Sequence, residues 1–405
     1  MTLWAGRVGA ELAAEVWEFL RADDSELLPY DWAATLQHAQ RLHAAGLLDA
    51  AELAQVRDAL VRRDPIEAED EDAHSAIERQ LGDVGKKIHA GRSRNDQVAA
   101  ALRIYVCDAC REAADAIRAF CGVALERAEA DAETPMPGYT HLQRAMPVTV
   151  GHHLLAWVEM LERDLVRFAA ADHAATPSPL GAGALAGSTL PLPPPDGEQA
   201  RNSLDAVADR DFALDYLYAC AMLFGHLSRI GEELILWSTT EFGFVKLPEF
   251  AATGSSMMPQ KLNPDVAELV RGKAGTMIGR LTGLLAVVKG LPLAYDRDLQ
   301  EDKTPVFAAR RDVRLALGAL TVLLDGLELD REKLAAACAD PLLRATDATE
   351  QLVREGVPFR DAHEQVAADV RAGTFEPPVK PSTPVAPGPA DVSAAVAAAR
   401  TRLRI

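Results

Sequence analysis

The stretch FALDYLYACAMLFGHLSRIGEELILW, from Phe212 to Trp237, decides the fold. Leucine and isoleucine recur in it at helical spacing, and its middle is apolar nearly all round. A helix of that kind is buried, because a surface helix keeps one polar face. We therefore expect a central helix over residues 212–237, packed among other helices.

Other helical patterns extend outward from this one. Pro suits the first turn of a helix, so helices should begin at Pro147 and at Pro264, the second with Asn263 as its N-cap. Gly275, Gly279 and Gly283 lie four apart, which favours a close helix–helix contact. The remaining expected helices cover 97–129, two or three pieces of 331–372, and 391–403, whereas 176–195 and 249–262 are loops. Because alternating strand patterns are almost absent, the fold class is all-α, with a central bundle of long helices.

The length of 405 residues exceeds one compact core of ordinary size. Two or three domains, or one elongated oligomeric body, are therefore expected, and we divide the chain into three domains. Residues 1–91 form an N-terminal helical domain that carries substrate-binding residues. Residues 92–332 form the long-helix bundle with a catalytic loop, and residues 333–405 form a shortened C-terminal helical domain with an extended Pro-rich segment at 376–389.

Charge and cysteine usage restrict the function. The formal charge of −18 argues against nucleic-acid partners, and no apolar run is long enough to span a membrane. The start of the chain lacks the basic and apolar regions of a signal peptide, so we expect a cytoplasmic protein with reduced thiols. Cys107 and Cys110 fall in a helical pattern, where we interpret them as helix thiols rather than a redox or zinc site; the other cysteines are Cys121, Cys220 and Cys338.

The loop TGSSMMPQKLNPD, from Thr253 to Asp265, contains groups suited to catalysis. Lys261 and Asn263 could stabilise an oxyanion near a helix N-terminus, where backbone N–H groups favour negative charge. Ser255, next to such donors, could act as a nucleophile or a base. The alternative is an ordinary Gly/Ser loop that ends in a helix cap.

Two further stretches contain groups that could transfer a proton or bind an anionic substrate. In PGYTHLQRAMPV (137–148), His141 lies in a loop between helices, and a carboxylate such as Glu268 would orient its ring. In HAGRSRNDQV (89–98), the arginine forks suit a small anionic substrate. The alternatives are a loop histidine without a role and a capped helix start with surface arginines.

Together these stretches resemble the argininosuccinate lyases of the fumarase/aspartase superfamily. Further similar motifs are LWAGR at 3–7, NSLDAV at 202–207 and DLQEDK at 298–303. The resemblance runs in order from Leu3 to about Val370. It implies a homotetramer with a multi-helix core, active sites shared between subunits, and no metal or organic cofactor.

The resemblance also implies reversible β-elimination of argininosuccinate to arginine and fumarate. Ser255 would be the base, Lys261 and Asn263 would hold the aci-carboxylate intermediate, and His141 with Glu268 would protonate the departing nitrogen or direct its proton. The implied substrate-binding residues are Thr35, Arg94, Asn95, Thr140, Arg210, Tyr295, Arg297 and Gln300.

The chain departs from the family pattern in four places. Arg297 replaces a usual lysine, Thr35 replaces a serine and is followed by an unusual Gln37, prolines at 191 and 193–195 replace an Asp-Arg pair, and the C-terminal domain is short. These changes leave the amine part of the substrate open. The alternatives are therefore a lyase for a different succinyl-amine adduct, a non-catalytic structural relative, or a plain helical binding protein.

Overall fold

A computed structural model describes residues 12–62, 64–378, 388 and 391–405. The chain divides into two compact units, each assembled from three stretches. Unit 1 contains Met1–Ala114, Leu165–Met222 and Gly275–Arg314, and unit 2 contains Asp115–Asp164, Leu223–Ala274 and Leu315–Ile405. The three-domain division with boundaries near 91 and 332 stays a prediction. The LWAGR motif and most of the Pro-rich segment lie outside the described residues.

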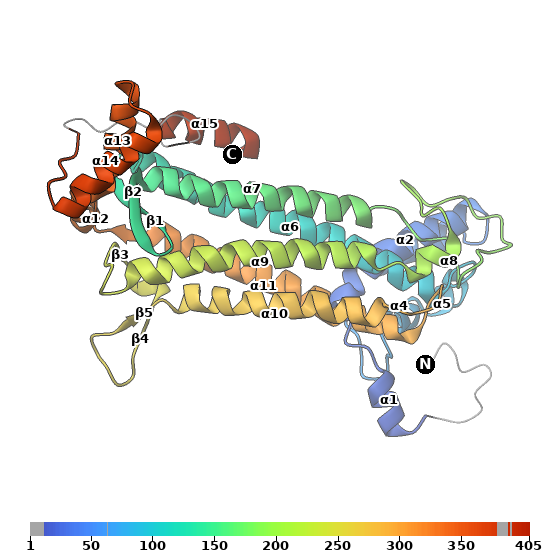
Figure 1. The fold of residues 1–405 in the computed structure, drawn as a ribbon. Coiled ribbons are helices and arrows are strands. Elements are labelled where there is room, and N and C mark those ends of the chain that lie inside the picture. Colours follow the sequence, from blue (N-terminus) through green and yellow to red (C-terminus); the bar gives the residue numbers. More distant parts are fainter. Residues whose placement is uncertain (1–11, 63, 379–387, 389–390) are drawn as a thin grey trace. The chain divides into compact units, whose positions relative to one another are not determined.

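Five long helices contribute residues to both units, and within each unit their segments run side by side (Figure 1). The strands that the structure describes are short and form only two-stranded sheets. The all-α prediction, with a bundle of long helices, is therefore confirmed. The long helices are α6 (Arg94–Ala130), α7 (Val150–Ala175), α9 (Asp211–Ser238), α10 (Asp265–Val288) and α11 (Lys303–Gly326).

Helix α9 is the predicted central helix, and its bounds differ by one residue at each end from the expected 212–237. Most of its large apolar side chains are buried, among them Tyr216, Phe224 and Leu227, whereas Tyr218 is about half exposed. Because these residues occupy several faces of the helix, α9 is packed on more than one side. No helix of the described residues has the length and apolar character needed to cross a membrane.

Short helices complete unit 1. Trp32, Leu42 and Ile77 are fully buried in the core that these helices form. Asp72 and Ser75 make a capping box that starts α4, so this helix has a fixed beginning. The short elements are α1 (Ala14–Leu20), η1 (Ser25–Leu27), α2 (Leu28–Ala44), α3 (Ala50–Arg62), α4 (Ala73–Leu81), α5 (Asp83–Ile88), α8 (Ser203–Ala208) and η3 (Arg297–Asp302).

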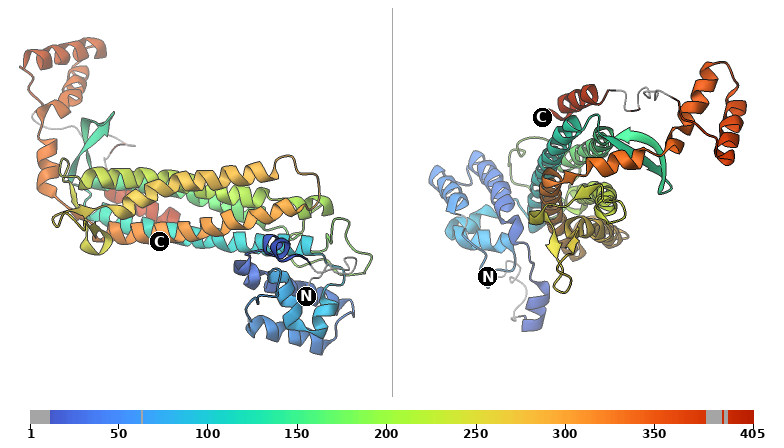
Figure 2. Two further views of the ribbon diagram at one scale, coloured as in Figure 1. Left: turned by 90° about the horizontal axis from the view of Figure 1, so that it is seen from below. Right: turned by 90° about the vertical axis from the view of Figure 1, so that its left-hand side faces the viewer.

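Unit 2 contains a β-hairpin and a set of short helices. In the hairpin, β1 (Pro135–Thr140) pairs with β2 (Gln143–Thr149), and α12 (Arg331–Cys338) packs along β1 (Figure 2). The predicted helices after residue 331 and at the end of the chain are confirmed. The other elements are η4 (Pro341–Arg344), α13 (Ala345–Arg354), α14 (Phe359–Ala372), α15 (Val392–Leu403), η2 (Glu249–Ala251), and the pairs β3 (Val245–Lys246) with β6 (Glu328–Leu329) and β4 (Thr253–Gly254) with β5 (Leu262–Asn263).

Two predicted helix starts are wrong. Pro147 pairs with Pro137 inside the hairpin, and α7 begins three residues later, at Val150. The strand has no alternating pattern, because prolines and a glycine interrupt it. Asn263 belongs to β5, and α10 begins after Pro264, because the β4–β5 pairing holds the Asn263 backbone in an extended conformation.

The cysteines are free thiols, and Cys107 and Cys110 lie in α6. Burial raises the pKa of the Cys107 thiol to about 11 and that of Cys121 to about 12. These thiols therefore stay protonated near neutral pH and are poor nucleophiles.

The glycines differ in how closely another helix approaches them. A Cβ on Gly231 of α9 would lie 2.7 Å from the Ala267 carbonyl oxygen of α10, so only glycine fits there. In contrast, a Cβ on Gly275, Gly279 or Gly283 would meet nothing within 4 Å. Among the described residues of one copy, the predicted close contact at these three glycines is therefore not found.

Gly231→Ala should lower the free energy of unfolding by about 1–3 kcal/mol, because the added methyl group overlaps a backbone carbonyl. Gly122→Ala is the matched control, since its Cβ would lie 3.9 Å from the Ile405 side chain, an ordinary contact. The control should stabilise the protein by about 0.5–1 kcal/mol through the helix propensity of alanine. Urea unfolding of both variants tests this, and equal stabilities would contradict the α9–α10 contact.

Candidate functional site

Unit 1 encloses a small polar cavity of about 180 Å³. Five of the eight predicted substrate-binding residues line it: Arg94 and Asn95 at the start of α6, and Tyr295, Arg297 and Gln300 around η3. These residues are about 200 positions apart in the sequence and meet only in the folded unit. The other lining residues are Leu20, Ala22, Asp24, Glu71, Asp72, His74, Val98 and Lys303.

The Arg94 guanidinium has donors left for a ligand. Its Nη1 lies 3.0 Å from Glu71 Oε2 and 3.3 Å from Asp72 Oδ2. Its Nε and Nη2 are buried and have no hydrogen-bond partner among the described residues. Unpaired buried donors are costly, so a bound carboxylate that accepted hydrogen bonds from them would be stabilised.

Arg297 and Gln300 both donate to the chain segment that precedes η1. Arg297 Nη2 lies 2.7 Å from the Leu20 carbonyl oxygen and 3.0 Å from Glu71 Oε1. Gln300 Nε2 lies 3.3 Å from the same Leu20 oxygen. These side chains therefore hold one wall of the cavity while they line it.

Two predicted substrate-binding residues lie behind the cavity rather than in its lining. Arg210 is buried and donates through Nε to Asp302 Oδ2, and the second oxygen of Asp302 lies 3.0 Å from Lys303 Nζ. Thr35 is buried and accepts a 2.8 Å hydrogen bond from Arg92 Nη1. Arg210 is thereby linked through Asp302 to Lys303, which lines the cavity.

The sequence reasoning missed several acidic and basic groups of the cavity. The run EDEDAH at 69–74, for which the sequence predicted no role in binding, supplies Glu71, Asp72 and His74. The His74 ring is oriented by Asp31, whose Oδ2 lies 2.6 Å from Nδ1, and its Nε2 is buried without a partner among the described residues. Burial opposes the charged form of His74, but Asp31 outweighs it, so the pKa of His74 is raised.

In unit 2, the turn of the β1–β2 hairpin presents Thr140 and His141. Thr140 pairs with Gln143, so His141 and Leu142 form a two-residue turn. Both have φ of 56°, the left-handed region that disfavours side chains other than Gly, Asn and Asp. The position predicted as a loop is therefore a tight hairpin turn with exposed side chains.

The loop between β4 and β5 in unit 2 carries the residues predicted to be catalytic, Ser255 and Lys261. Ser255 Oγ accepts hydrogen bonds from the backbone N–H groups of Met257 at 3.3 Å and Met258 at 3.0 Å. The Met258 carbonyl in turn accepts from the Lys261 N–H at 3.1 Å. Donors of this kind favour a negatively charged serine oxygen, which a serine base requires.

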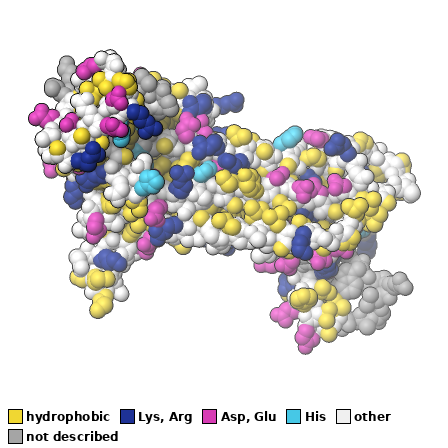
Figure 3. All heavy atoms as spheres, viewed as in Figure 1, with side chains coloured by type: hydrophobic (Ala, Val, Ile, Leu, Met, Phe, Trp, Pro, Cys, Tyr) yellow, Lys and Arg dark blue, Asp and Glu magenta, His cyan; other side chains and the backbone are white. Residues whose placement is uncertain are grey.

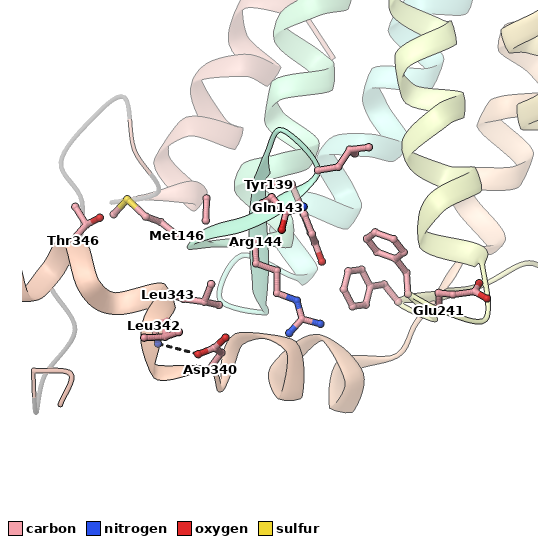
Figure 4. A pocket seen from close by; sticks show the side chains of 13 residues that line it. Tyr139, Gln143, Arg144, Met146, Glu241, Asp340, Leu342, Leu343 and Thr346 are labelled. Carbon is pink, nitrogen blue, oxygen red and sulfur yellow. Dashed lines mark hydrogen bonds between the residues drawn. The ribbon is translucent and has the colours of Figure 1, made fainter. Parts of the chain in front are cut away.

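Among the predicted catalytic residues, His141, Lys261 and Glu268 are exposed, and Ser255 and Asn263 are half-buried. No hydrogen bond or ion pair among the described residues joins His141 to Glu268, or Lys261 to Ser255 through its side chain. In the same part of the chain, no group of three or more His, Cys, Asp and Glu residues is arranged to hold a metal ion. A larger cavity of about 810 Å³ borders the hairpin and η4 (Figure 4).

Comparison with known proteins gives the family. Residues 33–279 match the family model described as Lyase, and residues 342–375 match the model described as Argininosuccinate lyase C-terminal. The chain is 51% identical over 389 residues to the argininosuccinate lyase of Frankia casuarinae, covering 90% of this chain and 83% of that protein. The chain belongs to the argininosuccinate lyase family. It is accordingly a lyase.

Another argininosuccinate lyase and a solved structure are also similar to this chain. The argininosuccinate lyase of Acidothermus cellulolyticus is 49% identical over 385 residues, covering 90% of this chain and 79% of that protein. The solved structure of an EDDS lyase variant with bound fumarate is 24% identical, with a TM-score of 0.79, and covers 98% of this chain and 91% of that chain. This structural likeness confirms the multi-helix lyase fold predicted from the sequence.

Leu142→Gly should raise the free energy of unfolding by about 1 kcal/mol, because glycine adopts the left-handed conformation without steric cost. Leu142 is 71% exposed, so little apolar burial is lost. Leu342→Gly is the control, since Leu342 is 50% exposed but lies in the right-handed η4 helix. Urea unfolding should show the control destabilised, and destabilisation of Leu142→Gly would contradict the strained turn.

Proposed function

We propose that this protein is an argininosuccinate lyase that cleaves argininosuccinate reversibly to arginine and fumarate in arginine biosynthesis, in the cytoplasm and without a cofactor. The observation that carries the proposal is the 51% identity to a relative named argininosuccinate lyase over 90% of the chain. The C-terminal match at 342–375 supports the same branch of the superfamily.

Ser255 is the proposed base. It removes a proton from the succinyl carbon beside the carbon that bears nitrogen, and the electrons move into the adjacent carboxylate to give an aci-carboxylate. The two backbone N–H groups that donate to its oxygen support this role, because they favour the deprotonated serine. Lys261 and Asn263 stabilise the intermediate, and collapse of the intermediate breaks the C–N bond and releases fumarate.

In this proposal, the substrate binds in the unit 1 cavity. The free donors of Arg94 support a carboxylate site, and Asn95, Tyr295, Arg297 and Gln300 surround it. Thr140 contributes from the hairpin, while Thr35 and Arg210 support cavity residues from behind. The departing nitrogen receives its proton through His141, with Glu268 as the carboxylate that orients the imidazole.

The active enzyme is a homotetramer in which different copies supply the parts of each site. The supporting observation is that, among the described residues of one copy, no hydrogen bond or ion pair joins His141 to Glu268 or Ser255 to the side chain of Lys261. The exposed face of α10 supports an assembly as well, since Ile278 and Leu285 are about half exposed beside the open glycines. Figure 3 shows hydrophobic side chains on exposed stretches of the long helices, as expected for surfaces that pack against another copy.

A lyase for another succinyl-amine adduct is the second candidate. Arg297 favours this second candidate. Its guanidinium donates to both Glu71 and the Leu20 carbonyl, whereas the usual lysine would present a single point charge. The proline run contributes a carbonyl at Pro193, which accepts a 2.7 Å hydrogen bond from Arg41 Nε. Steady-state comparison of adducts with different amines separates the two candidates.

Ser255→Ala should lower kcat for fumarate release from argininosuccinate by about 10²–10⁴-fold, because the general base is lost. Ultraviolet absorbance of fumarate provides the measurement. Ser256→Ala is the matched control in the same loop, and its kcat should stay near that of the wild type. Full activity of Ser255→Ala would overturn the proposed base, and absence of activity in folded, tetrameric wild-type protein would overturn the proposed substrate.

Gly279→Leu should break the tetramer, because a leucine side chain would fill the space that a second copy needs at α10. Ala372→Leu on exposed α14 adds the same kind of side chain elsewhere and should leave assembly intact. Sedimentation velocity distinguishes the species. An unchanged tetramer in Gly279→Leu would place the interface on another face.

A further inference from the structure

The hairpin turn that carries His141 cannot fix its own conformation. Its two residues, His141 and Leu142, both have φ of 56°. Asn-Gly and similar pairs favour such a turn locally, whereas histidine and leucine do not. The orientation of His141 therefore depends on what holds the two strands of the hairpin.

One side-chain contact anchors the first strand close to the turn. The rings of Tyr139 and Phe242 have centroids 5.6 Å apart at an interplanar angle of 47°. Phe242 also contacts the ring of Phe244, with centroids 5.4 Å apart at 85°. Aromatic pairs of this geometry stabilise the fold beyond the burial of their apolar surface. Tyr139 is two residues from His141, so this contact acts on the turn almost directly.

The second strand is held more loosely. Arg144, which pairs with Tyr139, donates from Nη1 to the Ala337 carbonyl at 3.4 Å, near the limit for a hydrogen bond. The cavity of about 810 Å³ borders this part of the hairpin, and Arg144 extends from the strand toward α12 (Figure 4). Because there is open space beside the hairpin, packing alone does not fix its tip.

Phe242 itself has a well-defined position at the end of α9. The Phe242 N–H lies 3.3 Å from Thr239 Oγ1, and the next N–H, of Gly243, lies 2.7 Å from the Thr239 carbonyl. The Phe244 N–H donates to the Trp237 carbonyl at 2.9 Å. These hydrogen bonds tie the backbone at Phe242 to the end of a long helix. The ring of Phe242, held by this backbone, is the surface against which Tyr139 packs.

We infer that Phe242 is a positioning residue for His141, acting through the ring of Tyr139. The inference rests on the proposed function, in which His141 handles the proton of the departing nitrogen. Phe242 touches neither substrate nor reacting atoms. It holds the strand that directs the imidazole, so its loss should affect the chemical step more than substrate binding.

Phe242→Leu tests this, because leucine keeps an apolar side chain and removes the ring. Its kcat for fumarate release should fall at least about tenfold, with KM changed less than about threefold. Phe242→Tyr should retain kcat, since the ring remains and the adjoining cavity has room for a hydroxyl. Phe359→Leu is the matched control on exposed α14, where the ring contacts only His363 among the described aromatic residues, and its kcat should not change.

Variants of Tyr139, whose ring packs against that of Phe242, give an independent test. Tyr139→Phe should retain kcat and Tyr139→Leu should lose it. The Phe242→Leu/Tyr139→Leu double variant should be no slower than the slower single variant, because both substitutions remove one contact. Multiplicative losses in the double variant, or equal losses in Phe242→Tyr and Phe242→Leu, would overturn the inference.

Hydrogen exchange separates this inference from the proposed function, because it requires no substrate. Amides of 136–149 should exchange faster in Phe242→Leu than in the wild type or in Phe359→Leu. Unchanged exchange in this segment would overturn the inference whatever the activity. If Phe242→Leu exchanges faster than the wild type but neither protein releases fumarate, the proposed substrate is overturned and the inferred anchoring stands.

Discussion

The buried ion pair between Arg210 and Asp302 is the interaction on which the unit 1 cavity depends. Both side chains are almost completely excluded from solvent, so removal of either partner would leave an uncompensated buried charge. The pair joins the residue before α9 to η3, which carries Arg297 and Gln300. Through its second oxygen, Asp302 also holds Lys303 at the cavity. The long helix α9 and the turn that carries Arg297 and Gln300 are thereby fixed to one another.

The cavity is electrostatically balanced before any substrate enters. Glu71 accepts from both Arg94 and Arg297, so the cationic groups remain ordered without a bound anion. Balance of this kind limits the desolvation penalty of the arginines. It also means that a substrate carboxylate gains most from donors that Glu71 does not use, namely the unpaired Nε and Nη2 of Arg94.

The hairpin turn and the Ser255 loop of unit 2, which carry the proposed catalytic residues, are subject to a different physical constraint. A tight turn and a short loop must present exposed polar groups while their own conformations are weakly determined. The β4–β5 pair closes the Ser255 loop at its base, and the ring pair of Tyr139 with Phe242 supports the hairpin near its tip. The Ser255 loop leads into the start of α10, and Phe242 follows the end of α9, so each segment adjoins the end of a long helix.

The sequence by itself determined the helices, the family and most of the candidate residues. Helix α9 could be predicted almost to the residue, because apolar periodicity is a local property that burial enforces directly. The hairpin at 135–149 could not, because its prolines and glycine obscure any strand pattern and its pairing is with a neighbouring segment. Only the tertiary structure decided that Asp24, Glu71, His74 and Lys303 share a cavity with Arg94, because long-range packing sets such contacts. Tertiary contacts likewise decided the left-handed turn at His141, since the local sequence alone favours another conformation.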